Sequence, residues 1–218
     1  MFAERAAAAG RLPGSPWFHD HVHFTFDGDY LAAQTFLAEI VKVINEGTVA
    51  APASATNLLA RAACAEALGF SVWDELSVEA AMVRAATQPP YLDQLEHAER
   101  QARAEAASQQ RIRQFQLENG IPRAIAFYRA ALARRPSDWQ IHFNFGALLK
   151  DFNDPQGALA EFTTATELMP DFCPARILLA QSLWAANRRD EAVRQLQEAL
   201  RYDSEFGPAK EGLAQLKR

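Results

Sequence analysis

A 34-residue period in the second half of the chain constrains its fold more than any other feature. The segments AIAFYRAALARRP, ALAEFTTATELMP and AVRQLQEALRYDS occupy residues 124–136, 158–170 and 192–204. All three carry alanine at their first and eighth positions and a large apolar residue at their fifth. A fixed period of this length is typical of a solenoid, in which similar helical units stack on one another.

An apolar partner segment precedes the second and third of these segments. These partners are IHFNFGALLKDF and ARILLAQSLWAA, at residues 141–152 and 175–186. Their apolar residues recur every three or four positions, which predicts helices buried along one face. Residues 153–155 and 187–190 are typical of turns between paired helices. The sequence therefore predicts stacked helical hairpins, and residues 206–218 predict a closing helix with a polar face.

These hairpins resemble the tetratricopeptide repeat (TPR). The repeat starting at Trp139 carries the family's pattern at Phe145, Gly146, Leu149, Ala158, Phe162, Ala165 and Pro170. The repeat starting at Cys173 carries it at Leu179, Ala180, Leu183, Ala192, Leu196 and Ala199, with Ser204 in place of proline. The repeat starting near Glu105 fits mainly in its second half. The resemblance implies an all-α fold of antiparallel helical hairpins, stacked as a short TPR solenoid behind an irregular N-terminal segment. A generic helical array is the alternative, but four positions keep the 34-residue period: the three described above and the last position of each segment, which is Pro136, Pro170 and Ser204.

The residues before the repeats predict further helices. Residues 29–46 predict an amphipathic helix with Asp27 or Asp29 as its cap. Its expected apolar face consists of Tyr30, Ala33, Leu37, Ile40, Val41 and Ile44. Gly69 is expected to end a helix over residues 57–68, Ser71 and Asp74 resemble a capping box, and Ser77 could cap another helix. We predict domains at residues 1–46, 54–104 and 105–218, the last holding about three repeats and the capping helix.

Composition and charge exclude some partners. Of the 218 residues, 49% are hydrophobic, which is enough for a buried core, and the net charge is -5. An acidic chain gives no electrostatic reason to bind nucleic acid. No apolar run is long enough to span a membrane, and the first 15 residues do not resemble a signal peptide. We therefore expect the chain as given to be cytoplasmic, with neither nucleic acid nor membrane as a partner.

Three of the five histidines lie in the stretch FHDHVHFTFDGDY, residues 18–30. Residues 16–26 alternate as a strand would, which would place His19, His21 and His23 on one face. Three imidazoles could hold zinc, with Asp27 or Asp29 as a further ligand. No other ligand cluster supports that alternative, so we expect no metal or cofactor. A second interpretation pairs Asp20 with His23, because a carboxylate can orient a histidine that acts as a general base.

The stretch DHVHFTFDGDYLAA resembles the last conserved block of SGNH-type (GDSL-like) hydrolases. The resemblance implies that Asp20 is the orienting carboxylate, His23 the catalytic base and Gly28 the turn before a terminal helix. PPYLDQLEH (residues 89–97) resembles a segment of bacterial proteins that join such a hydrolase to TPRs. The family's Gly-Asp-Ser motif is missing, and Ser15 lies outside any such motif. We interpret the chain as the C-terminal part of a larger SGNH-type hydrolase and do not expect it to be an enzyme by itself.

The expected function is a protein-interaction scaffold. In the resembled family, the first helix of each repeat lines a peptide-binding groove. The expected groove residues are Gln140, Phe143, Asn144, Ala147, Lys150, Ile177, Gln181 and Trp184. They lack the run of Lys, Arg and Asn with which the family clamps acidic chaperone tails. The partner would be a protein or peptide, or the missing hydrolase domain. The alternatives are an esterase or acyl-transfer hydrolase that needs the missing serine segment, and a metal-binding module at the histidines.

Overall fold

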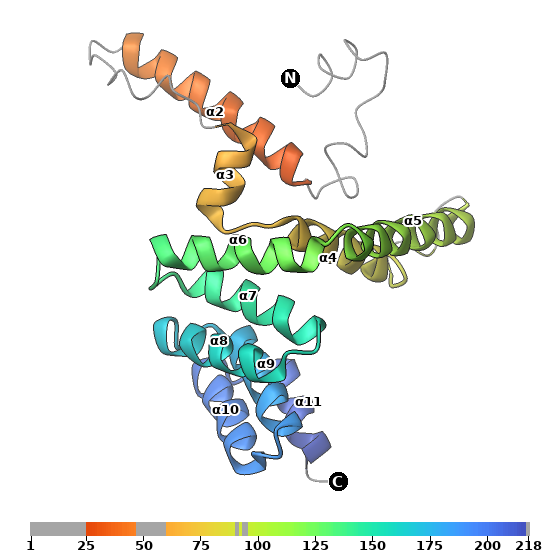
Figure 1. The fold of residues 1–218 in the computed structure, drawn as a ribbon, viewed down its shortest axis with the longest axis vertical. Helices are drawn as coiled ribbons and strands as arrows, with labels where there is room; N and C mark the ends of the chain where they lie inside the picture. Colours follow the sequence, from red (N-terminus) through yellow and green to blue (C-terminus); the bar gives the residue numbers. More distant parts are fainter. Residues whose placement is uncertain (1–24, 47–59, 90–91, 93–95, 217–218) are drawn as a thin grey trace. The chain divides into compact units, whose positions relative to one another are not determined.

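The computed structural model describes residues 25–46, 60–89, 92 and 96–216. These residues are mostly helical and contain no strand (Figure 1), which confirms the predicted all-α fold. The helices are α2 (Phe26–Glu46), α3 (Arg61–Leu68), α4 (Val72–Ala85), α5 (His97–Leu117), α6 (Gly120–Arg134), α7 (Trp139–Asp151), α8 (Pro155–Leu168), α9 (Cys173–Ala185), α10 (Arg189–Tyr202) and α11 (Gly207–Leu216).

The chain divides into two compact units. One comprises residues 1–65 and 75–110, as far as they are described, and the other comprises residues 66–74 and 111–218. Helices α3, α4 and α5 each contribute residues to both units. The domain boundaries that the sequence suggests remain predictions.

The second unit contains the stacked hairpins. Helix α7 packs on α8 and α9 packs on α10, and α8 packs on α9 to join the two hairpins. Helix α6 packs on α7 before them, and α11 packs on α10 after them. The residues of the second helices that recur every 34 positions at the first, fifth and eighth places of the segments are all buried and contribute to the core: Ala124, Tyr128, Ala131, Ala158, Phe162, Ala165, Ala192, Leu196 and Ala199. The period therefore predicts which face of each second helix is buried.

Small residues on the first helices allow close packing of the hairpins. A Cβ atom added at Gly146 would lie 2.8 Å from two ring carbons of Phe162, closer than nonbonded carbons approach. The next repeat has Ala180 and Leu196 at the equivalent positions, and both are buried. Where glycine is replaced by the larger alanine, phenylalanine is replaced by the smaller leucine. The two repeats satisfy one packing requirement with different residue pairs.

The turn between the helices of each hairpin contains a left-handed asparagine. Asn119, Asn153 and Asn187 have φ angles of 56°, 62° and 61°. Asparagine is several-fold enriched among non-glycine residues with positive φ, whereas β-branched residues are strained there. These asparagines also follow the 34-residue period. Asp154, directly after the second turn, caps α8 by accepting a hydrogen bond from the backbone N–H of Gly157 at 2.9 Å.

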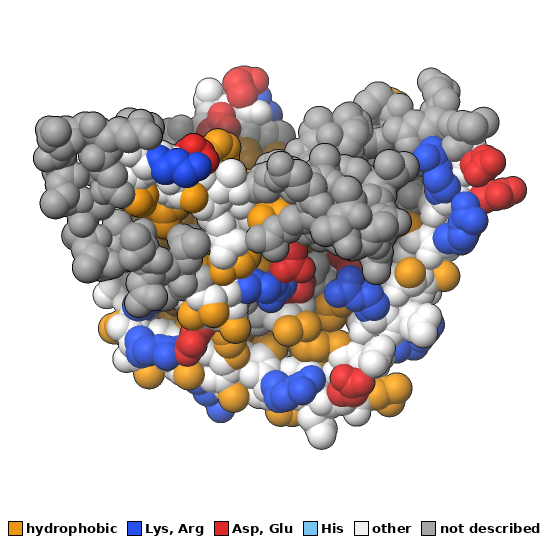
Figure 2. Space-filling model, turned by 90° about the horizontal axis from the view of Figure 1, so that it is seen from above, with side chains coloured by type: hydrophobic (Ala, Val, Ile, Leu, Met, Phe, Trp, Pro, Cys, Tyr) orange, Lys and Arg blue, Asp and Glu red, His pale blue; other side chains and the backbone are white. Residues whose placement is uncertain are grey.

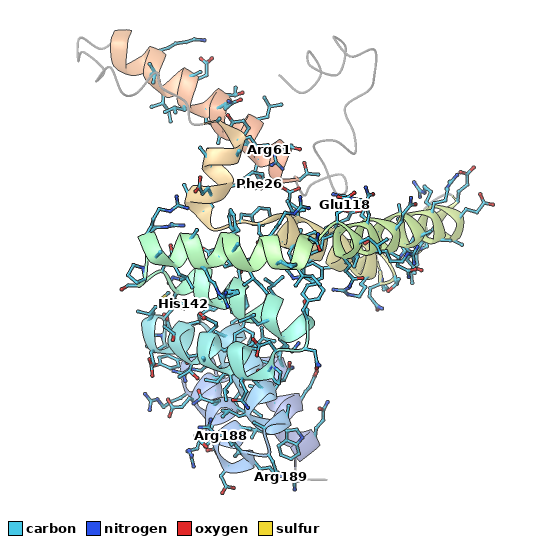
Figure 3. All side chains as sticks on the ribbon, viewed as in Figure 1. Phe26, Arg61, Glu118, His142, Arg188 and Arg189 are labelled. Atoms are coloured by element: carbon cyan, nitrogen blue, oxygen red, sulfur yellow. The ribbon has the colours of Figure 1, made fainter. Side chains whose placement is uncertain are left out.

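A polar link between helices also recurs with the repeat. His142 on α7 donates from Nε2 to the carbonyl of Pro136 at 2.9 Å, and its Nδ1 lies 2.6 Å from a carboxylate oxygen of Glu161 on α8 (His142 is labelled in Figure 3). In the next repeat, Arg176 Nε donates to the carbonyl of Pro170 at 2.7 Å, and Arg176 Nη1 donates to the side chain of Gln195 at 2.8 Å. These three residues are equivalent to His142, Pro136 and Glu161.

Residues 66–74 contact α6 and α7 within the second unit. Asp74 accepts hydrogen bonds from the Ser71 backbone at 2.5 Å and from the Ser71 hydroxyl at 2.7 Å, which confirms the predicted capping box. The hydroxyl of the fully buried Tyr128 donates to the same carboxylate oxygen at 2.5 Å. Burial raises the pKa of Asp74 despite these hydrogen bonds, which act to lower it. Trp73, two residues after Ser71, packs edge-on against Phe152 with 4.6 Å between ring centroids.

Two predictions for the first part of the chain are wrong at particular residues. Asp27 and Asp29 lie inside the first turn of α2, and the cap is Thr25, whose hydroxyl accepts from the Gly28 N–H at 3.1 Å. Asp27 instead pairs with Arg61. Ser77 does not cap a helix, because it lies inside α4 with a buried hydroxyl that has no partner among the described residues.

The predicted apolar face of α2 is also only partly right. Leu37 and Ile40 are exposed, as is Ala33, whereas Leu31 and Ala32 are buried. A hydrophobic stripe is buried only where another element covers it. Near its start, α2 meets the N-terminus of α3 through Arg61, whose guanidinium also lies 4.8 Å over the ring of Phe26.

Candidate functional site

The eight residues predicted to line a groove come from the first helices of the two well-formed hairpins. Helix α7 supplies five of them and α9 supplies three, at spacings of three, four and seven that place them on one side of each helix. Helices α7 and α9 also contact each other. We call this set the first-helix face: Gln140, Phe143, Asn144, Ala147, Lys150, Ile177, Gln181 and Trp184.

The first-helix face is accessible along its length. Gln140, Lys150 and Gln181 are exposed, and Trp184 is 38% exposed although it is a large aromatic residue. The remaining four residues are half-buried. By contrast, the positions of α7 and α9 that follow the TPR pattern, such as Phe145 and Leu179, are buried. The two helices therefore bury one side and leave the other open.

A cation covers the aromatic residue at one end of this face. The guanidinium of Arg189, the first residue of α10, lies 4.9 Å from the ring centroid of Trp184. The neighbouring Arg188 makes a bidentate ion pair with Glu191 at 2.6 and 2.7 Å (Figure 3 labels both arginines). Arg189 was missed from the sequence, because it belongs to a second helix rather than a first helix.

Aromatic residues surround the other end. Phe143 meets Phe172 edge-on with 5.2 Å between centroids, and Trp139 lies 4.6 Å from Phe172. An open hollow of about 510 Å³ lies beside Trp139 and Gln140 and is lined by residues 135–140. These contacts hold the Phe143 ring in place while part of it remains open to solvent.

Charge is nearly absent from the first-helix face. Lys150 is its only charged member, although 22% of the chain is charged. The side chains of Gln140, Asn144 and Gln181 make no hydrogen bond within the described part of the chain. Elsewhere, as Figure 2 illustrates for one view, acidic and basic side chains are interspersed on the described surface.

The candidate residues near the N-terminus lie outside the described residues. Asp20 and His23, predicted from the hydrolase resemblance, belong to this group, as do His19 and His21. Within the described ranges, no group of three or more His, Cys, Asp or Glu side chains could hold a metal ion. Nor is any described helix long and apolar enough to cross a membrane.

Comparison with known proteins supports the TPR assignment. Residues 149–216 match the family model described as tetratricopeptide repeat. This match covers the end of α7 through α11, so the C-terminal part of the chain carries TPRs. The search of curated proteins finds no match.

Two similar solved structures are also TPR proteins. The first TPR of Spaghetti, solved with the HSP90 peptide SRMEEVD, is 14% identical over 48% of this chain and 83% of that chain, with a TM-score of 0.43. A TPR protein from Parabacteroides merdae is 19% identical over 66% of this chain and 53% of that chain, with a TM-score of 0.44.

Proposed function

We propose that this chain is a protein-interaction scaffold that holds a peptide segment of its partner on the first-helix face. One observation carries the proposal: the second helices bury their repeated residues, while the first helices leave a continuous set of apolar and polar side chains open. Aromatic residues that are at least partly open to solvent and are held in place by neighbours are favourable anchors, because little side-chain freedom is lost on binding. Phe143 and Trp184 meet this description.

The proposal is tested by substitution of one anchor and one matched residue. A decapeptide selected from a random displayed library is labelled and titrated by fluorescence anisotropy. Trp184→Ala should weaken its binding about tenfold or more, as expected for an aromatic anchor. Leu168→Ala on α8 is the control, because Leu168 is also 38% exposed but lies on a second helix. Equal losses in both variants would contradict the proposal.

The finer proposal is that the chain is the C-terminal part of an SGNH-type hydrolase. It is supported by the Asp-x-x-His spacing of Asp20 and His23 and by the sequence around them. Without a serine nucleophile and oxyanion donors, the chain alone should not turn over an aryl acetate. Enzyme-like turnover that is lost in His23→Ala would contradict this. Zinc retained after dialysis of the wild type, but lost in His21→Ala, would instead favour the metal-binding alternative.

A further inference from the structure

The first-helix face presents carboxamide side chains without internal partners. Gln140 and Asn144 lie on α7, and Gln181 lies on α9. None of these three side chains makes a hydrogen bond with a described residue. A carboxamide offers both N–H donors and a carbonyl acceptor, which are the groups that a peptide backbone requires. The face can therefore pair with the backbone of a bound segment, whatever its side chains are.

The spacing of these carboxamides fits an extended peptide. Gln140 and Asn144 are four residues apart, which is about 6 Å along a helix axis. Backbone groups on one side of an extended chain recur every two residues, about 6.6 Å apart. One extended segment running along α7 could therefore pair with both side chains. Phe143 and Ala147, on the same side of the helix, would contact the side chains that alternate with those backbone groups.

The near absence of charge on the first-helix face indicates that the bound partner segment should carry few charged side chains. A charged side chain loses hydration when it is covered, and it needs a partner of opposite charge to compensate. Lys150 is the only charge on the first-helix face, and Asp151 follows it directly. At the other end, Arg189 stacks on Trp184 beside Asp190. Several carboxylates or several ammonium groups would find no matching set of partners.

We propose that the partner supplies an extended segment that is uncharged where it contacts the first-helix face. Gln140, Asn144 and Gln181 bind its backbone, and its apolar side chains pack on Phe143, Ile177 and Trp184. This inference rests on the proposed function and adds the chemical class of the partner. The proposal distinguishes the first-helix face from a peptide-binding face that would select an acidic tail.

The test uses an array of synthetic decapeptides in matched triplets, each capped at both ends. The first member of each triplet is neutral and alternates apolar residues with Ser, Thr or Gln. In the second member, two of these polar residues are replaced by Asp, and in the third member the same two are replaced by Lys. The neutral member should bind at least about tenfold more tightly than its charged relatives. Asn144→Leu should weaken that binding about two- to tenfold, whereas Gln197→Leu, an exposed position on α10, should not.

Asn144→Asp keeps the side-chain size and adds a negative charge, so this variant should bind the Lys member of each triplet more tightly, relative to the neutral member, than the wild type does. Circular dichroism verifies that each variant is folded. Acidic peptides that bind as tightly as neutral ones, with binding still lost in Trp184→Ala, would overturn this inference but leave the proposed function standing. If no peptide of any triplet binds, both fail.

Discussion

Gly146 provides a sharp test of the helix packing, because two effects of known size oppose each other there. Helix propensity alone should raise the free energy of unfolding of Gly146→Ala by about 1 kcal/mol. The new Cβ would lie 2.8 Å from two ring carbons of Phe162, whereas carbon atoms normally approach to about 3.5 Å. Phe162 is fully buried, so its ring cannot relieve the contact by turning toward solvent. Overpacking of this kind costs about 1–3 kcal/mol, so we expect a net loss of about 0–2 kcal/mol.

A second substitution identifies the cause. Phe162→Leu alone should destabilise by about 1–3 kcal/mol, because it leaves a cavity. Combined with Gly146→Ala, it recreates the Ala180 and Leu196 pair of the next repeat. The double variant should be more stable than the two single losses predict, by about 1 kcal/mol or more.

The measurement is urea unfolding followed by circular dichroism and by tryptophan fluorescence, because repeat proteins need not unfold in one step. Gly207→Ala is the control, since a Cβ there would meet nothing within 4 Å. A Gly146→Ala protein that is about 1 kcal/mol more stable than the wild type, with no coupling to Phe162→Leu, would refute the packing argument.

Three further predictions concern single residues. Asn153→Val should destabilise by about 1–2 kcal/mol and Asn153→Gly should not, because φ at this position is 62°; equal melting temperatures for the two variants would count against the turn assignment. Ala158→Trp should cost at least about 1–3 kcal/mol, because Ala158 is fully buried, and an unchanged urea midpoint would contradict the helix register. Burial raises the pKa of Asp74 in the folded state, so its stabilising contribution is full below the unfolded pKa and declines as pH rises through the folded pKa. The wild type should therefore lose stability relative to Asp74→Asn as pH rises above the unfolded pKa of aspartate, about 4, and the opposite slope in thermal melts would be inconsistent with burial as the cause.

The repeat half of the fold could be predicted from the sequence, because its period records packing directly. Ala158, Phe162 and Ala165 recur every 34 residues since each hairpin must bury the same face against its neighbours. Gly69 and the Ser71–Asp74 pair were likewise predictable, because the end and the start of a helix have local chemical requirements.

Other features depend on contacts that have no local signal. The hydrogen bond from Tyr128 to Asp74 joins residues 54 positions apart. The exposure of Ile40 depends on which element covers α2, and amphipathic spacing alone does not specify that element. On the first-helix face, the spacing predicts which side of α7 and α9 is open. It does not predict that Arg189, on the following helix, covers Trp184.

The central claim is that a partner segment binds to the first-helix face, and amide chemical shifts test it most directly. The isotopically labelled chain is titrated with the tightest-binding neutral decapeptide, and the shift changes are assigned to residues. The account predicts that the largest changes fall on α7 and α9, including Asn144 and Gln181, and that they disappear in Trp184→Ala. Changes concentrated on the exposed sides of α8 and α10, with α7 and α9 unaffected, would contradict it.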